Sequence, residues 1–121
     1  MSTLLLFNIE DETKRTAIRL LSMRLGFSYI DVPFSRQGMT VSELLKREEG
    51  EKRVLSPFTD EMMVMYAFPS QSMHALLDTM RNNGCPVRLK CVVTETNKSW
   101  TAEHLHREIA AEEQNMRKRR K

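Results

Sequence analysis

The sequence predicts an α/β domain: a four-stranded sheet with helices on both faces. Short apolar runs alternate with amphipathic stretches in the order strand, helix, strand, short helix, strand, helix, strand, helix. The runs at residues 4–9 and 62–68 are almost continuously apolar, which is typical of central strands covered on both faces. The chain of 121 residues, 40% hydrophobic and 29% charged, has the size and composition of one folded domain.

A helix follows the first apolar run. Ile18, Leu21 and Leu25 recur at three- and four-residue intervals, which places them on one face of a helix. Gly26 stands where a helix would end, and the acidic residues from Asp11 onward suit its start. The sequence therefore predicts a helix from about Asp11 to Gly26.

The next elements are a short strand and a short helix. Residues 28–32 form the strand candidate. Thr40 and Glu43 have the spacing of a capping box, which predicts a helix from there to about Glu48. Residues 47–54 are rich in charge and include a glycine, so we expect a flexible loop there.

The second half repeats the first in outline. An amphipathic stretch after Ser70 predicts a third helix, which Gly84 would end. Residues 87–94 alternate apolar and charged side chains, as in an edge strand, and Thr101 is placed to cap a final helix. Residues 5–26 and 64–84 share the pattern of strand, helix and glycine, which suggests an internal duplication.

Two sheet topologies fit this order. A parallel sheet with strand order 2-1-3-4 would use the segment after residue 33 as a crossover with two helices on each face. A ferredoxin-like antiparallel sheet, in the order 4-1-3-2, would join strands two and three by a hairpin. The segment 33–60 is too long for a usual hairpin loop, so we favour the parallel sheet. We assign residues 1–116 to one domain and residues 117–121 to a basic, flexible tail.

The charge distribution indicates where a nucleic acid could bind. The formal net charge is +3, and all five residues of 117–121 are basic, so the rest of the chain carries −2. The tail could contact phosphates, but no aromatic residues are interleaved with its charges to stack on bases, and a frayed terminus is the favoured interpretation.

Cellular location and cofactors follow from what the sequence contains. No apolar run is long enough for a membrane helix or a secretory signal, so we expect a cytoplasmic protein. Cys85 and Cys91 are then free thiols and core residues. His104 and His106 lie two apart on a helix and point to different faces, which disfavours a metal site, and the glycines are too widely spaced for a phosphate loop. We expect no cofactor or metal, and no catalytic residues are assigned.

A parallel sheet would gather polar residues at one edge, where open α/β sheets bind ligands. A small-ligand or anion site there would use residues that follow strands one, three and four: Asn8, Asp11, Ser70, Thr94, Thr96, Asn97 and Trp100. The alternative, which we favour for the residues of 94–101, is that they only form a turn and cap a helix.

Several segments resemble one family. They are Pro57-Phe58-Thr59-Asp60-Glu61-Met62-Met63-Val64-Met65, then Leu76-Leu77-Asp78, then Leu89 to Asn97 with Trp100, and Leu105-His106-Arg107-Glu108-Ile109. Together they resemble the bacterial family known as domain of unknown function 3783. The similarity is strongest over residues 57–113, although Glu95 and Cys91 stand where many relatives have proline and alanine. The resemblance implies an intracellular bacterial protein and implies no activity.

The leading functional hypothesis is a non-catalytic regulatory or protein-interaction module. Its partner would be another protein or a second copy of the chain in a homodimer. Nine methionines suit an adaptable interaction surface. The alternatives are a small-ligand or anion-binding domain, with or without enzymatic activity, and a nucleic-acid accessory protein that acts through the tail.

Overall fold

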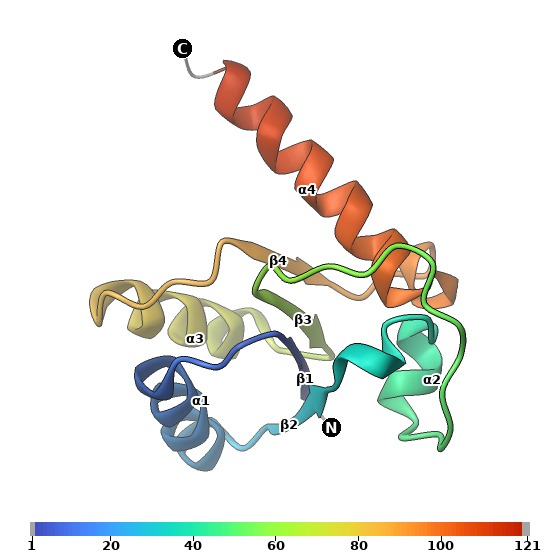
Figure 1. Ribbon diagram of the computed structural model, residues 1–121. Coiled ribbons are helices and arrows are strands. Elements are labelled where there is room, and N and C mark those ends of the chain that lie inside the picture. The colour runs from blue at the N-terminus through green and yellow to red at the C-terminus, as the bar shows by residue number, and fades with distance from the viewer. Residues whose placement is uncertain (1, 120–121) are drawn as a thin grey trace.

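The computed structural model describes residues 2–119 and contains every predicted helix and strand in the predicted order (Figure 1). Two short 3-10 turns, η1 and η2, are added to them. In chain order the elements are β1 (Thr3–Phe7), α1 (Glu12–Leu25), β2 (Ser28–Val32), η1 (Phe34–Arg36), α2 (Val41–Leu45), β3 (Met62–Tyr66), α3 (Ser70–Asn82), β4 (Leu89–Val92), η2 (Asn97–Ser99) and α4 (Ala102–Arg119).

The sheet has the predicted strand order, β2-β1-β3-β4, but it is mixed. β1 and β2 are parallel, β3 and β4 are parallel, and the central pair β1 and β3 is antiparallel. The prediction of a parallel sheet is therefore right for the two outer pairs and wrong for the central pair. After β2, the chain packs α2 on the sheet and returns to the edge at which β1 ends, so that Met62 lies opposite Phe7. A long connection fits this path as well as it fits a crossover.

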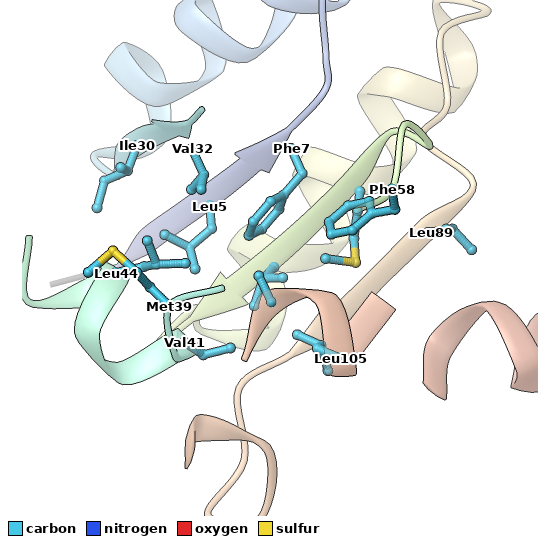
Figure 2. Close-up of a cluster of buried hydrophobic side chains, with 13 residues drawn as sticks. Leu5, Phe7, Ile30, Val32, Met39, Val41, Leu44, Phe58, Leu89 and Leu105 are labelled. Carbon is cyan, nitrogen blue, oxygen red and sulfur yellow. The ribbon is translucent and has the colours of Figure 1, made fainter. Parts of the chain in front are cut away.

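Helices cover both faces of the sheet, as predicted. Leu4 and Leu6 of β1 face α1 and α3, whereas Leu5 and Phe7 face α2 and α4. Figure 2 shows the cluster on the α2 and α4 face, where the ring of Phe58 lies beside that of Phe7. Because alternate residues of the central strands are buried on opposite faces, both strands are apolar over nearly their whole length.

The predicted helix caps are present. Asp11 accepts hydrogen bonds from the backbone of Thr13 at 2.7 Å, and Gly26 ends α1 with φ 75°. Thr40 and Glu43 form the capping box of α2, and Thr101 accepts a hydrogen bond from the His104 backbone at 3.2 Å. These local signals fixed where three of the helices begin or end.

The suggested duplication has a counterpart in the sheet. Thr3 pairs with Tyr66 and Phe7 pairs with Met62, so Leu5 and Val64 lie opposite each other at the centre. An approximate two-fold axis through this central pair exchanges β1 with β3, and with them the attached α1 and β2 with α3 and β4. The residues that follow β1 and β3 even share a left-handed backbone, with φ 60° at both Asn8 and Ala67.

The same axis relates the other two helices. Thr40 and Thr101, the caps of α2 and α4, form an antiparallel bridge. Val41 donates its N–H to the Trp100 carbonyl, and Ala102 donates to the Met39 carbonyl, both at 2.9 Å. The chain is thus built from two copies of one unit, strand, helix, strand, 3-10 turn and helix.

The two copies differ most in their last helix. α2 ends at Leu45, earlier than the predicted Glu48, whereas α4 runs to Arg119 and projects beyond the sheet (Figure 1). The first part of the predicted basic tail therefore belongs to α4. Its last two residues, Arg120 and Lys121, lie outside the described residues.

Candidate functional site

The seven residues predicted to share one ligand-binding edge lie at opposite ends of the sheet. Because β1 and β3 are antiparallel, their carboxyl ends point in opposite directions. Asn8 and Asp11 follow β1 at one end. The remaining five follow β3 or β4 at the other end: Ser70, Thr94, Thr96, Asn97 and Trp100. The structure does not bring the set together, and binding of a ligand by either subset stays a prediction.

Most of these side chains have partners within the fold. Asn97 is only 8% exposed; its side-chain oxygen accepts from the Thr94 backbone at 2.8 Å, and its amide donates to the Val92 carbonyl at 3.1 Å. Trp100 stacks on His104 with ring centroids 4.4 Å apart. Ser70 is an exposed residue in the first turn of α3. These contacts match the interpretation of the segment as a turn that leads into a capped helix.

A different feature lies at the end of the sheet where β1 finishes. Residues 55–60, which we call the strap, have no regular secondary structure and contact the residue after β1 and the first turns of α4. Gln37 is completely buried and pairs with Phe58 as a neighbouring strand would, donating to its carbonyl at 2.9 Å and accepting its N–H at 3.0 Å. Glu103, 7% exposed, accepts from the backbone N–H groups of Leu55 at 3.0 Å and Ser56 at 2.9 Å.

Aromatic and polar contacts complete the place where the strap lies. We call this place the seat of the strap, and it consists of Phe7, Asn8, Gln37, Glu103 and His106. The Phe58 ring stacks on His106 at 4.1 Å and lies 5.7 Å from the Phe7 ring. Asn8 donates to the carbonyls of Phe58 and Asp60, each at 3.0 Å, and His106 Nε2 lies 2.8 Å from the Asp60 carboxylate. The strap is therefore a peptide segment of this chain, held by its main chain, by the Phe58 ring and by the Asp60 carboxylate.

An open hollow lies at the opposite end of the sheet. It has a volume of about 350 Å³, and we call it the α2 hollow. Its lining residues come from α2, the end of β3 and the segment after β4: Ser42, Leu45, Lys46, Tyr66, Val93 and Lys98. Leu45 and Val93 pack against the core cluster and form an apolar floor, while the lysines and Tyr66 are exposed at the rim.

The α2 hollow is the two-fold counterpart of the seat of the strap. Phe7 and Tyr66 are the last residues of the exchanged strands β1 and β3. The remaining residues correspond by their distance from the bridged caps Thr40 and Thr101, a numbering supported by matching turn bonds from Met39 to Arg36 and from Trp100 to Asn97. The pairs are Phe7 with Tyr66, Gln37 with Lys98, Glu103 with Ser42, and His106 with Leu45. Four side chains that hold the strap thus correspond to four that line the hollow.

Sequence reasoning missed the seat of the strap. Gln37 and Glu103 look like surface residues, and the segment 55–60 has no periodic pattern. The one available signal was Phe58, a large apolar residue between turn-forming residues. Its partners come from positions that are distant in the chain, so no local pattern identifies them.

The cysteine thiols are sheltered. Burial and the nearby Glu112 carboxylate raise the pKa of Cys91 to about 12, so its thiol stays protonated at neutral pH. Cys85 is buried in the cluster under α1 and α3. Among residues 2–119, no group of three or more His, Cys, Asp and Glu side chains is arranged to hold a metal ion.

One ion pair involves the first residue of the predicted basic tail. Arg117 lies on α4 and contacts Glu113 at 2.7 Å one turn earlier.

Over the described part of the chain, no helix has the length and apolarity that crossing a membrane requires.

Comparison with known proteins finds a family match that covers most of the second copy of the unit. No curated protein and no solved structure matches the chain significantly. Residues 61–116 match a protein family described as "Domain of unknown function (DUF3783)", which confirms the resemblance seen in the sequence. The match begins at the residue before β3 and includes α4 up to Met116, so the first copy of the unit lies outside it. The part of this chain that resembles the DUF3783 family is therefore the second copy of the unit, from β3 to Met116 of α4.

Proposed function

We propose that the protein is a non-catalytic interaction module that binds an extended peptide segment of a partner protein in the α2 hollow. The observation that carries this proposal is the two-fold relationship between the hollow and the seat of the strap. One of two equivalent places on the fold already holds a peptide, namely the strap. The other is open and lined by the corresponding residues.

The shape and composition of the hollow support this proposal. Its volume of about 350 Å³ falls within the range of roughly 300–1,000 Å³ that is typical of ligand pockets. The apolar side chains of Leu45 and Val93 lie among hydroxyl and ammonium groups of Ser42, Tyr66 and Lys98. An apolar floor with a few polar groups at the rim suits a peptide side chain with its adjoining main chain.

A larger hollow lies between β4 and α4 and is less informative. Its volume is about 480 Å³, and Arg88, Lys90, Glu112 and Glu113 give it charges of both signs. The α4 residues that line it correspond to positions beyond Leu45, where α2 ends, so the two-fold comparison indicates no occupant for it. The α2 hollow is therefore the better-supported binding place.

A synthetic strap peptide tests the proposal. The ¹⁵N-labelled chain is titrated with acetyl-Leu-Ser-Pro-Phe-Thr-Asp-Glu-amide, which has the sequence of residues 55–61. We expect saturable shift changes in amides of α2, of Tyr66 and of residues 93–98. Saturable changes confined to other surfaces, or none at millimolar peptide, would contradict the proposed function.

Two serine substitutions give a matched control. Ser42→Tyr places a ring in the hollow and should abolish the shift changes. Ser35→Tyr adds the same ring to an exposed position of η1 that does not line the hollow, and should leave them intact. Equal loss of binding in both variants would contradict the proposal.

A further inference from the structure

The differences between the two corresponding sites identify the kind of peptide that the hollow would take. This inference rests on the proposed function, because it assumes that the hollow binds a peptide. Each difference replaces a group that suits the strap with one that suits another ligand. Gln37 corresponds to Lys98, and Glu103 corresponds to Ser42.

The first difference concerns hydrogen bonding. The amide of Gln37 both donates and accepts, so it pairs with the carbonyl and the N–H of Phe58. An ammonium group only donates, so Lys98 can bind only an acceptor on the ligand. Ser42 also takes the place of the Glu103 carboxylate, which removes the negative charge that holds the backbone N–H groups of the strap.

The second difference concerns net charge. Lys46 stands at the rim of the hollow next to α2, and Lys98 stands on η2 across from it. Lys98 contacts Glu95 at 2.7 Å, but that carboxylate is 91% exposed. An ion pair at such a position is weak because water screens it, so a ligand carboxylate can replace Glu95. Lys46 corresponds to another cation, Arg107, so the change in charge comes from the other two pairs. Lys98 stands in place of a neutral amide and Ser42 in place of a carboxylate, which makes the hollow more positive than the seat of the strap.

The apolar part of the site is kept. The Phe58 ring lies between His106 and Phe7, whose counterparts are Leu45 and Tyr66. Val93, the counterpart of Val32, forms part of the floor. A flat ring placed against Tyr66 and Leu45 would bury apolar area in the same way as Phe58 does in its own seat.

We infer that the α2 hollow recognises an aromatic residue with a carboxylate close to it in the peptide. The ring would lie on Leu45 and Val93 and against Tyr66, and the carboxylate would lie between the ammonium groups of Lys46 and Lys98. Two sources supply such a carboxylate: an acidic side chain near the aromatic residue, or the C-terminus of a chain that ends on it.

Four peptides separate the parts of this inference by isothermal titration calorimetry. The parent is acetyl-Leu-Ser-Pro-Phe-Thr-Asp-Glu-amide; one analogue has Ala for Phe, and another has Asn and Gln for Asp and Glu. The fourth, acetyl-Leu-Ser-Pro-Phe with a free carboxylate, places the charge at a chain end. We expect that loss of the ring abolishes binding and that loss of the acids weakens it about tenfold, because a charge-assisted hydrogen bond is lost. If the parent binds more tightly than the fourth peptide, the carboxylate comes from an acidic side chain. If the fourth peptide binds more tightly, it comes from the C-terminus of a chain.

Charge reversal in the protein provides the matched test. Lys46→Glu and Lys98→Glu should each weaken the parent peptide about tenfold and leave the uncharged analogue unchanged. Arg24→Glu, the same change in charge on an exposed position of α1, should leave both affinities unchanged. Thermal unfolding of each variant checks that the fold is kept.

The outcomes distinguish a failure of the proposed peptide binding from a failure of the inference about the ring and the carboxylate. If none of the four peptides binds, the proposed function itself fails. If the parent and its uncharged analogue bind equally well at the hollow, the peptide-binding function stands and the inference about the carboxylate is overturned. Equal binding of the alanine analogue would overturn the inference about the ring.

Discussion

Thr40 and Thr101 cap two different helices and lie opposite each other in an antiparallel bridge on an approximate two-fold axis. The residues on either side of them exchange two main-chain hydrogen bonds of 2.9 Å. This arrangement joins α2 to the start of α4 and sets how the two copies of the unit meet on that face of the sheet.

Replacing either capping threonine should destabilise the protein. Thr40→Ala and Thr101→Ala each remove a side-chain acceptor for a backbone N–H group, which costs about 1 kcal/mol in free energy of unfolding. Urea denaturation measures the change. Thr13→Ala, at an exposed position inside α1, is the control and should change the stability by less than about 0.5 kcal/mol. A capping variant as stable as this control would show that the caps do not hold the helix starts.

The buried Gln37 should be the most sensitive contact of the strap. In Gln37→Leu the size of the side chain is nearly kept, but the N–H and C=O groups of Phe58 lose their partner. An unsatisfied buried group costs about 1–3 kcal/mol, and the loss should appear as a lower urea midpoint. Hydrogen exchange at the Phe58 amide should become faster at the same time.

The exposed Gln71→Leu is the matched control for that measurement. It should leave both the urea midpoint and the Phe58 exchange rate unchanged. Slow exchange at Phe58 in Gln37→Leu would mean that Gln37 does not hold the strap.

Glu43 gives the protein a defined acid sensitivity. Its hydrogen bonds with Lys52 and the Thr40 backbone lower its pKa from 4.5 to about 2. Since the pKa is lower in the folded state, the pair stabilises the protein above the ordinary value of 4.5, and this stabilisation is lost as the pH falls toward 2. NMR titration of the Glu43 carboxyl should give a midpoint near 2.

The Lys52→Met variant tests the cause of that shift. Removing the ammonium group should raise the pKa of Glu43 toward its ordinary value, while the bond to Thr40 keeps part of the effect. A midpoint near 4.5 in the unmodified protein would contradict the contact between Glu43 and Lys52.

The thiols should be unreactive in the folded protein. Burial raises the pKa of Cys91 to about 12, so almost no thiolate exists at pH 8. A Cys85→Ser variant isolates Cys91, and we expect its alkylation by iodoacetamide to be far slower in buffer than in guanidinium chloride. Equal rates in the two solutions would show that Cys91 is open to solvent.

Local signals predicted the elements, and the elements alone did not determine the site. The capping box of Thr40 and Glu43 and the glycine after α1 act within a few residues, so the sequence reveals them directly. The apolar runs of β1 and β3 showed that both strands are central. Burial on both faces is the same for parallel and antiparallel neighbours, so those runs contain no information on strand direction.

The strand direction then decided the fate of the predicted site. Reversing β3 relative to β1 moved Asn8 and Asn97 to opposite ends of the sheet. The hollow that replaced the predicted site is built from α2 in one half and Tyr66 and Lys98 in the other. Lining residues from two halves of a chain meet only through the fold, so no motif in the sequence marks them.

The position of the bound ring tests peptide binding in the α2 hollow. Intermolecular nuclear Overhauser effects are measured between the phenylalanine ring protons of the parent peptide and the methyl groups of the ¹³C-labelled protein. We expect contacts to Leu45 and Val93, the floor of the α2 hollow. Contacts only to methyl groups outside the hollow, such as that of Met116 beside β4, would contradict this expectation.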